Sequence, residues 1–175
     1  MILKHFKSKL VNFCVILFLI FNSQNCSKDF APYVPDVPIY YELSLNNELA
    51  FLGETEFVTI TSLPTNNNYS VVDYHKKTPI HFTIYWKTYG NGVIIYRTSA
   101  DEYQAFDLTC PYRGLEDHCA LKLLAGDFVA TCPCCKSTFV LSANGAPSIG
   151  SKATRPLMMY SCSLANNGLL LIVSK

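Results

Sequence analysis

Cys110-Pro-Tyr112, Cys119 and Cys132-Pro-Cys134-Cys135-Lys-Ser-Thr-Phe139 together contain five of the eight cysteines in a chain of 175 residues. So many thiols within one short span are hard to explain as ordinary core packing. The two cysteine segments therefore predict either a metal or cluster site or a pair of disulfides. The rest of the sequence is mainly scaffold.

The residues around the two cysteine segments have the composition of β-strands. Residues 103–108 lead into Cys110, residues 128–131 lead into Cys132, and residues 139–141 leave the second segment. Short runs rich in β-branched and aromatic residues predict further strands. These further strands are expected at residues 40–45, 57–61, 80–86, 93–96, 157–161 and 169–173.

Turn signals separate several of these strands. The segment Tyr89-Gly-Asn-Gly92 lies between the predicted strands 80–86 and 93–96, and it predicts a hairpin. Residues 65–68 form a polar turn, and Asn166-Asn167-Gly168 joins the last two strands. Only residues 116–124 leave room for a short helical turn. The sequence therefore predicts an all-β domain with two cysteine loops at one end.

The N-terminus indicates the compartment. Lys4, Lys7 and Lys9 precede a short apolar run at residues 11–21. A membrane-spanning helix needs about 20 apolar residues, so this run is too short and predicts an export signal. The sequence 31–38 contains three prolines and predicts an extended tether.

Cys26 follows the apolar run and precedes a short polar segment. This arrangement resembles the processing site of bacterial lipoproteins, in which the cysteine becomes the lipidated first residue. The resemblance implies a signal peptide at 1–25, a tether at 26–38, a domain at 39–175, and an exported protein anchored to a membrane. The alternative is a soluble secreted protein in which Cys26 is a spare thiol.

Charge and size limit the function further. Removal of the first 25 residues takes away three lysines and no acid, which changes the formal net charge from +1 to −2. That balance argues against a nucleic-acid partner. Enough chain remains for one domain with its own core. The carboxylates Asp107, Glu116 and Asp117 are separated from one another and are predicted to be solvated loop charges.

At its cysteine segments the chain resembles the Rieske iron-sulfur family. In that family two loops at one end of a stack of antiparallel sheets hold a [2Fe-2S] cluster, each supplying one Cys and one His, and a disulfide bridges the loops. Cys110 and Cys132 occupy the two cysteine-ligand positions. The resemblance also implies a disulfide between Cys119 and Cys134. Lys136 stands where the family has a glycine.

The two histidine positions of the family hold other residues, Tyr112 in the first loop and Cys135 in the second. Among the histidines of the chain, only His118 is near the loops. A cluster with two histidine ligands is therefore not expected. Histidine ligation raises the reduction potential of a Rieske centre, so that property should be missing here.

Three interpretations of the cysteines remain open. In the first, a [2Fe-2S] cluster binds three thiolates and a fourth ligand and carries electrons to a redox protein partner. Its thiolates come from Cys110, Cys132 and Cys135, and its fourth ligand from Tyr112, Cys119 or His118. A Rieske domain of this length is expected to transfer electrons and not to catalyse a reaction by itself.

In the second interpretation the site binds zinc. Cys132 and Cys135 have the spacing of a zinc knuckle, and Cys110 with Cys119 would complete four thiolates. In the third, no metal binds and the domain is a structural or interaction module. Its cysteines are then oxidised, Cys119 with Cys134 as in the family and Cys110 with either Cys132 or Cys135.

Overall fold

The structure, a computed structural model, describes residues 34–36, 38–76, 78 and 80–175. The predicted signal peptide and Cys26 lie outside these residues, and so does most of the predicted tether. At the end of the tether, Val34 is buried and Asp36 forms an ion pair with Lys175. In the described part of the chain, no helix combines the length and apolar character needed to cross a membrane.

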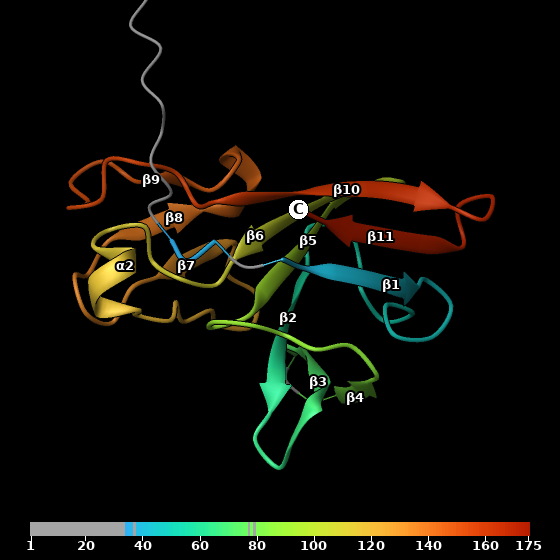
Figure 1. Cartoon of the computed structure of the whole chain (residues 1–175). Coiled ribbons are helices and arrows are strands. Elements are labelled where there is room, and N and C mark those ends of the chain that lie inside the picture. The colour runs from blue at the N-terminus through green and yellow to red at the C-terminus, as the bar shows by residue number, and fades with distance from the viewer. Residues whose placement is uncertain (1–33, 37, 77, 79) are drawn as a thin grey trace, which may run out of the picture. The chain divides into compact units, whose positions relative to one another are not determined.

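Two antiparallel sheets make up the described residues (Figure 1). The large sheet has the strand order β1-β11-β10-β6-β5-β2-β3-β4, and the small sheet has the order β7-β8-β9. The prediction of an all-β domain is confirmed. The strands are β1 Tyr40–Ser44, β2 Phe57–Leu63, β3 Asn66–Tyr74, β4 Ile80–Ile84, β5 Val93–Ser99, β6 Glu102–Asp107, β7 Val129–Thr131, β8 Thr138–Val140, β9 Ala146–Pro147, β10 Met159–Ala165 and β11 Leu170–Ser174; the short helices are α2 Gly114–Asp117 and η1 Leu141–Ala143.

Strand β5 is buried on both faces, because a separate hydrophobic cluster covers each of them. Side chains alternate across a strand, so Val93 and Ile95 join one cluster while Ile94 and Tyr96 join the other. The first cluster takes side chains from the other strands of the large sheet. The second contains Phe139 of the small sheet together with four of the five loop cysteines, Cys110, Cys119, Cys132 and Cys135. The small sheet and its cysteines are thus held against the middle of the large sheet.

The large sheet curls, so that β1 meets the segment that follows β4. Tyr41 in β1 donates a buried hydrogen bond of 3.1 Å to Thr88 Oγ1. The neighbouring Tyr40 ring lies edge-on to Trp86, with 5.6 Å between the ring centroids. Residues from the two edge strands therefore share one core, which reduces the exposed edge of the sheet.

The predicted hairpin between residues 80–86 and 93–96 is wrong. β4 pairs with β3, whereas β5 pairs with β2 and β6, so two strands separate β4 from β5. The reason is β3, whose first part reads Asn66-Asn-Asn and therefore carries no strand pattern in the sequence. Part of the polar turn predicted at 65–68 belongs to this strand. The turn is tighter and falls between Leu63 and Asn66.

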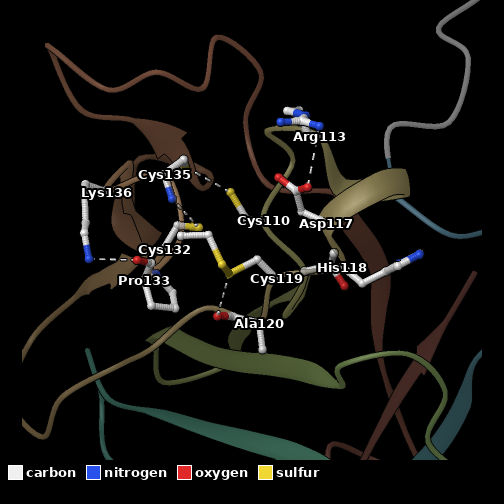
Figure 2. The surroundings of a disulfide bond; sticks show 12 residues. Cys110, Arg113, Asp117, His118, Cys119, Ala120, Cys132, Pro133, Cys135 and Lys136 are labelled. Carbon is white, nitrogen blue, oxygen red and sulfur yellow. Dashed lines mark hydrogen bonds and ion pairs between the residues drawn. A yellow bond between two sulfur atoms is a disulfide. The ribbon is translucent and has the colours of Figure 1, made fainter.

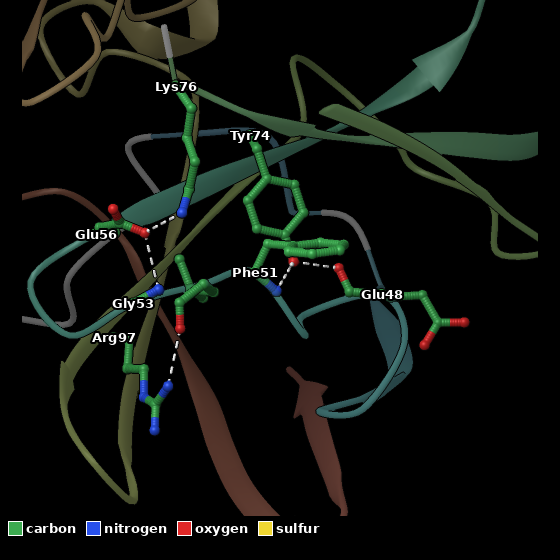
Figure 3. A network of polar contacts seen from close by, with 8 residues as sticks. Glu48, Phe51, Gly53, Glu56, Tyr74, Lys76 and Arg97 are labelled. Atoms are coloured by element: carbon green, nitrogen blue, oxygen red, sulfur yellow. Dashed lines mark hydrogen bonds and ion pairs between the residues drawn. The ribbon is translucent and has the colours of Figure 1, made fainter. Parts of the chain in front are cut away.

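The connection between β1 and β2 is fixed by polar contacts to the large sheet (Figure 3). Tyr74 Oη accepts the Phe51 backbone N–H at 3.3 Å and donates to the Glu48 carbonyl at 2.7 Å. Glu56 accepts the backbone N–H of Gly53 and pairs with Lys76, both at 2.8 Å. Leu49 and Leu52 of the connection belong to the first hydrophobic cluster, so these polar contacts hold the connection against that core.

Candidate metal centre

The first cysteine loop joins β6 to β7 and folds back on itself. The Cys110 backbone N–H donates to the Cys119 carbonyl at 2.9 Å, and the Leu121 N–H donates to the Leu108 carbonyl at 2.8 Å. These ladder-like bonds bring Cys110 and Cys119 side by side, with α2 at the tip between them. The eight intervening residues therefore form a closed loop.

Asp107 anchors the start of this loop and is not a solvated charge, contrary to the sequence prediction. Its side chain is 5% exposed. Its Oδ1 accepts the Thr109 backbone N–H at 2.6 Å, and its Oδ2 accepts the Tyr160 hydroxyl at 2.5 Å. An aspartate often forms a turn by accepting the backbone N–H of the residue two positions later. The sequence Asp107-Leu-Thr109 before Cys110 therefore carries a signal for this turn. Glu116 and Asp117 are exposed, as predicted.

The second cysteine loop is a tight connection between β7 and β8. The Cys132 N–H donates to the Ser137 carbonyl at 2.8 Å, and the Lys136 N–H donates to the Cys132 carbonyl at 3.0 Å. Lys136 has φ 65°. This is the left-handed region that favours glycine, the residue found at this position in the Rieske family. Lys136 Nζ donates to the Pro133 carbonyl at 2.7 Å.

The two loops bring three thiols together (Figure 2). The Sγ atoms of Cys110, Cys132 and Cys135 all lie within 4.8 Å of one another, and we refer to them as the sulfur triad. The Cys110 and Cys135 sulfurs are 3.7 Å apart. All three side chains are buried and none is in a disulfide. One loop supplies one thiol and the other loop supplies two.

Each sulfur of the triad accepts a backbone N–H. The donors belong to Tyr112 for Cys110, to Cys135 for Cys132 at 3.5 Å, and to Ser137 for Cys135. Every donor lies two or three residues after its acceptor, so the turn of the loop itself aims the N–H at the sulfur. Such hydrogen bonds stabilise negative charge on sulfur and tune thiolate-bound metals.

The Ser137 hydroxyl is fully buried beside the triad, 3.1 Å from Cys135 Sγ. Its oxygen accepts both the Ala153 backbone N–H at 2.9 Å and the hydrogen of the Cys135 thiol. When Cys135 is a thiolate, the hydroxyl can instead donate its own hydrogen to the sulfur. Burial raises the pKa of the Cys135 thiol, but the hydrogen bonds from Ser137, Cys132 and Cys110 outweigh it and lower the pKa. At Cys110 burial dominates and raises the pKa of the thiol.

A disulfide joins Cys119 to Cys134 next to the triad, with 6.5 Å between the Cα atoms. This is the pair that the resemblance to the Rieske family implied. The disulfide covalently links the two loops that supply the triad. Its sulfurs both lie within 4.8 Å of Cys132 Sγ, so Cys132 belongs to both groups of sulfur atoms.

The other candidate ligands lie differently. Tyr112 contributes its backbone N–H, while its side chain is 36% exposed. His118 is exposed and belongs to neither sulfur group among the described residues. Cys119 is engaged in the disulfide. Cys162 on β10 is a free thiol outside both groups, and burial raises its pKa to about 11.

The triad fits a thiolate-bound metal and does not fit the histidine-ligated Rieske cluster. Soft thiolate donors suit zinc and iron-sulfur units. The carboxylates and histidines of the described residues do not join the triad. A centre here would therefore have three thiolate ligands and one further ligand, with the N–H donors of the loops directed at the sulfurs.

No protein-family model matches the chain, and no curated protein matches it either. Among solved structures, the chain is similar in fold to one described as an NADH-dependent nitrite reductase small subunit from Mycobacterium tuberculosis. The two chains are 11% identical, and the alignment covers 80% of this chain and 97% of the other with a TM-score of 0.36.

Proposed function

We propose that this chain is a Rieske-like domain of an exported lipoprotein and that it binds a [2Fe-2S] cluster through Cys110, Cys132 and Cys135. The sulfur triad carries the proposal. Three buried thiols meet at one point, and each sulfur accepts a backbone N–H. Thiols that only fill a core do not need such donors, whereas metal-bound thiolates do.

Each residue near the triad has its own proposed role in holding such a centre. Cys110, Cys132 and Cys135 supply thiolates, and Tyr112, two residues after Cys110, is the proposed fourth ligand. Ser137 and the backbone donors stabilise charge on the sulfurs. A bound iron-sulfur cluster supplies one-electron transfer. The domain then passes electrons to a redox protein and catalyses no reaction itself.

A single zinc ion is the second candidate, and one sulfur–sulfur distance in the triad fits it. Zinc binds thiolate sulfur at about 2.3 Å, so two sulfurs on one tetrahedral ion are about 3.8 Å apart. The Cys110 and Cys135 sulfurs are separated by 3.7 Å. All three sulfurs of the triad are close enough to share one ion. Zinc would make the domain a structural or interaction module.

Metal analysis and absorption spectroscopy of the full chain, purified without oxygen, test the proposal. Two irons per chain with visible absorption would support the iron-sulfur cluster. One zinc without visible absorption would support the second candidate and exclude electron transfer. A chain that contains neither metal, and binds neither on reconstitution, would overturn the metal centre altogether and favour the cofactor-free module.

Variants locate the centre. Cys110→Ser and Cys135→Ser should each abolish the metal content or shift the spectrum, because each removes one of three thiolates. Cys162→Ser is the matched control, since it removes a free thiol that lies outside the triad. Equal metal content in Cys135→Ser and Cys162→Ser would exclude Cys135 as a ligand.

We also propose that Cys26 is lipidated and anchors the mature protein to a membrane on the exported side. The support is the sequence pattern of a short apolar run followed by a cysteine and a polar tether. Growth with a labelled fatty acid should label the wild-type chain and leave Cys26→Ser unlabelled. Label retained in Cys26→Ser, or a soluble wild-type protein in cell fractions, would overturn this assignment.

A further inference from the structure

Cys132 lies between two chemically different partners. On one side are the thiols of Cys110 and Cys135, and on the other is the disulfide between Cys119 and Cys134 (Figure 2). Cys132 Sγ is within 4.8 Å of both disulfide sulfurs. A free thiol this close to a disulfide can reach it for thiol–disulfide exchange after a side-chain rotation that brings the thiolate into line with the sulfur–sulfur bond, since exchange proceeds by attack of a thiolate on one sulfur of the pair.

We propose that Cys132 has two mutually exclusive roles: in the metal-free domain it attacks the disulfide and forms a Cys119–Cys132 bridge, and in the metal-bound domain coordination prevents this attack. The first role depends only on the sulfur positions. The second rests on the metal centre proposed above. Nothing in the Rieske resemblance requires the bridging disulfide to rearrange.

The exchange balances without an outside reagent. Cys132 Sγ forms a bond to Cys119 Sγ while the bond between Cys119 and Cys134 breaks. The electron pair of the broken bond leaves with Cys134 as a thiolate, which then takes up the proton that the Cys132 thiol released. One disulfide and the same number of thiols remain, so neither an oxidant nor a reductant is consumed.

Exposure favours Cys119 as the sulfur attacked. Cys134 is exposed and Cys119 is buried. If Cys134 leaves, its thiolate is solvated, whereas a departing Cys119 thiolate would be buried without a charged partner, which costs free energy. Attack on Cys119 also makes a bridge between the two loops, so the rearranged domain keeps a covalent link there.

The rearrangement would convert the three-thiol site into a site with two thiols. Once Cys132 is in a bridge it is no longer a thiolate ligand, and the triad is reduced to Cys110 and Cys135. A metal bound by Cys132 keeps that sulfur from attacking. The disulfide connectivity of the domain therefore reports whether the site holds metal.

Disulfide mapping with an alkylating trap tests the proposal. The full chain is stripped of metal with a chelator, kept without oxygen, and incubated with iodoacetamide at neutral pH. Exchange releases the Cys134 thiol, and the reagent alkylates it irreversibly. This alkylation draws the exchange toward the Cys119–Cys132 bridge. Trypsin then releases peptides 114–122 and 123–136, which remain linked, and fragmentation between Cys132 and Pro133 tells which cysteine is bridged.

The metal-free wild-type chain should accumulate the Cys119–Cys132 bridge with alkylated Cys134. A saturating concentration of zinc, used as the probe metal, should slow this at least tenfold. Cys132→Ser should keep the original bridge, and Cys110→Ser should still exchange but lose the protection by zinc. Cys162→Ser should behave as the wild type. If Cys132→Ser fails to fold, the disulfide map of the wild-type chain with and without zinc still tests both the exchange and its prevention by metal.

Two results would overturn the exchange: an unaltered Cys119–Cys134 bridge in metal-free wild type whose Cys132 is still unalkylated after prolonged trapping, or the same Cys134 alkylation in Cys132→Ser. Exchange at equal rates with and without zinc, in a chain shown by metal analysis to bind it, would overturn the mutual exclusion. Exchange in a chain that binds no metal would overturn the metal centre and leave the exchange standing.

Discussion

Tyr160 on β10 donates a 2.5 Å hydrogen bond to Asp107 Oδ2 at the end of β6. The same carboxylate accepts the Thr109 backbone N–H through Oδ1. Burial and the negative charge of Asp107 both raise the pKa of the Tyr160 hydroxyl, so it stays protonated and remains a donor at neutral pH. The large sheet thereby fixes the point at which the first cysteine loop begins.

Tyr160→Phe should lower the free energy of unfolding by about 1.5–3 kcal/mol, the typical contribution of a buried hydrogen bond to a charged group. The variant leaves Asp107 Oδ2 buried without its donor. Urea denaturation gives the value. Tyr40→Phe is the matched control, because the Tyr40 hydroxyl also bonds a carboxylate, Glu42, but at an exposed site. Equal effects of the two substitutions would show that the buried bond has no special importance.

Gly92→Ala should destabilise the domain more than Gly90→Ala. Both glycines have positive φ, so both substitutions cost about 1 kcal/mol of backbone strain. A Cβ at Gly92 would lie 2.3 Å from the Ile60 carbonyl oxygen, whereas a Cβ at Gly90 meets nothing within 4 Å. The contact with rigid backbone should add about 2 kcal/mol or more, measured as the difference between the two variants in urea. Similar losses would contradict the close approach of these strands.

Local pattern was enough to predict most strands, because alternation and β-branched composition mark them directly. It failed at β3, where asparagines hide the start of a strand that is stabilised by its neighbours on both sides. The prediction of which strands pair with one another also depended on β3. Once β3 was missed, the turn signal at Gly90 and Gly92 favoured a hairpin between strands that in fact lie three positions apart in the sheet. Strand partners are set by tertiary packing, which single-segment patterns do not contain.

The candidate site was predicted as a set of cysteines, and the structure supplies their grouping. Spacing alone left several pairings open for Cys110, Cys132 and Cys135. The ladder between Cys110 and Cys119 and the tight turn after Cys132 decide which sulfurs meet. Asp107 was predicted to be solvated because a charged residue in a loop usually is. The turn that it forms with Thr109 has a sequence signal, but its burial depends on Tyr160 of β10, which is remote in the sequence and adjacent to β6 in the sheet.

Acidification below about pH 6.5 should destabilise the domain through His75. Burial beside Phe57 lowers the pKa of this imidazole, while the negative charge of Asp73 opposes the shift. The unfolded chain then binds a proton at a higher pH than the folded chain does. Stability is therefore retained above the unfolded pKa of 6.5 and falls as the pH drops below it.

The replacement His75→Gln removes the titrating group and keeps a polar partner for Thr59 Oγ1, which lies 2.9 Å from His75 Nε2. Urea denaturation between pH 7.5 and about pH 5.5 should show a smaller loss of stability for this variant than for the wild type. Parallel pH profiles for the two proteins would contradict the assignment. The His75 imidazole titration, followed by NMR, gives the folded-state pKa directly.

Ser137→Ala should weaken metal binding by about 10- to 100-fold, the usual effect of removing a group that orients a ligand. The substitution removes the hydroxyl 3.1 Å from Cys135 Sγ and leaves the Ala153 N–H without its acceptor. Competition with a chromophoric zinc chelator measures the affinity. Ser161→Ala, at an exposed position on β10, is the control and should bind as the wild type does. An unchanged affinity in Ser137→Ala, in a variant that unfolds at the wild-type urea concentration, would mean that the hydroxyl only supports the loop. A loss of affinity without a matching loss of stability would show that it acts on the sulfur.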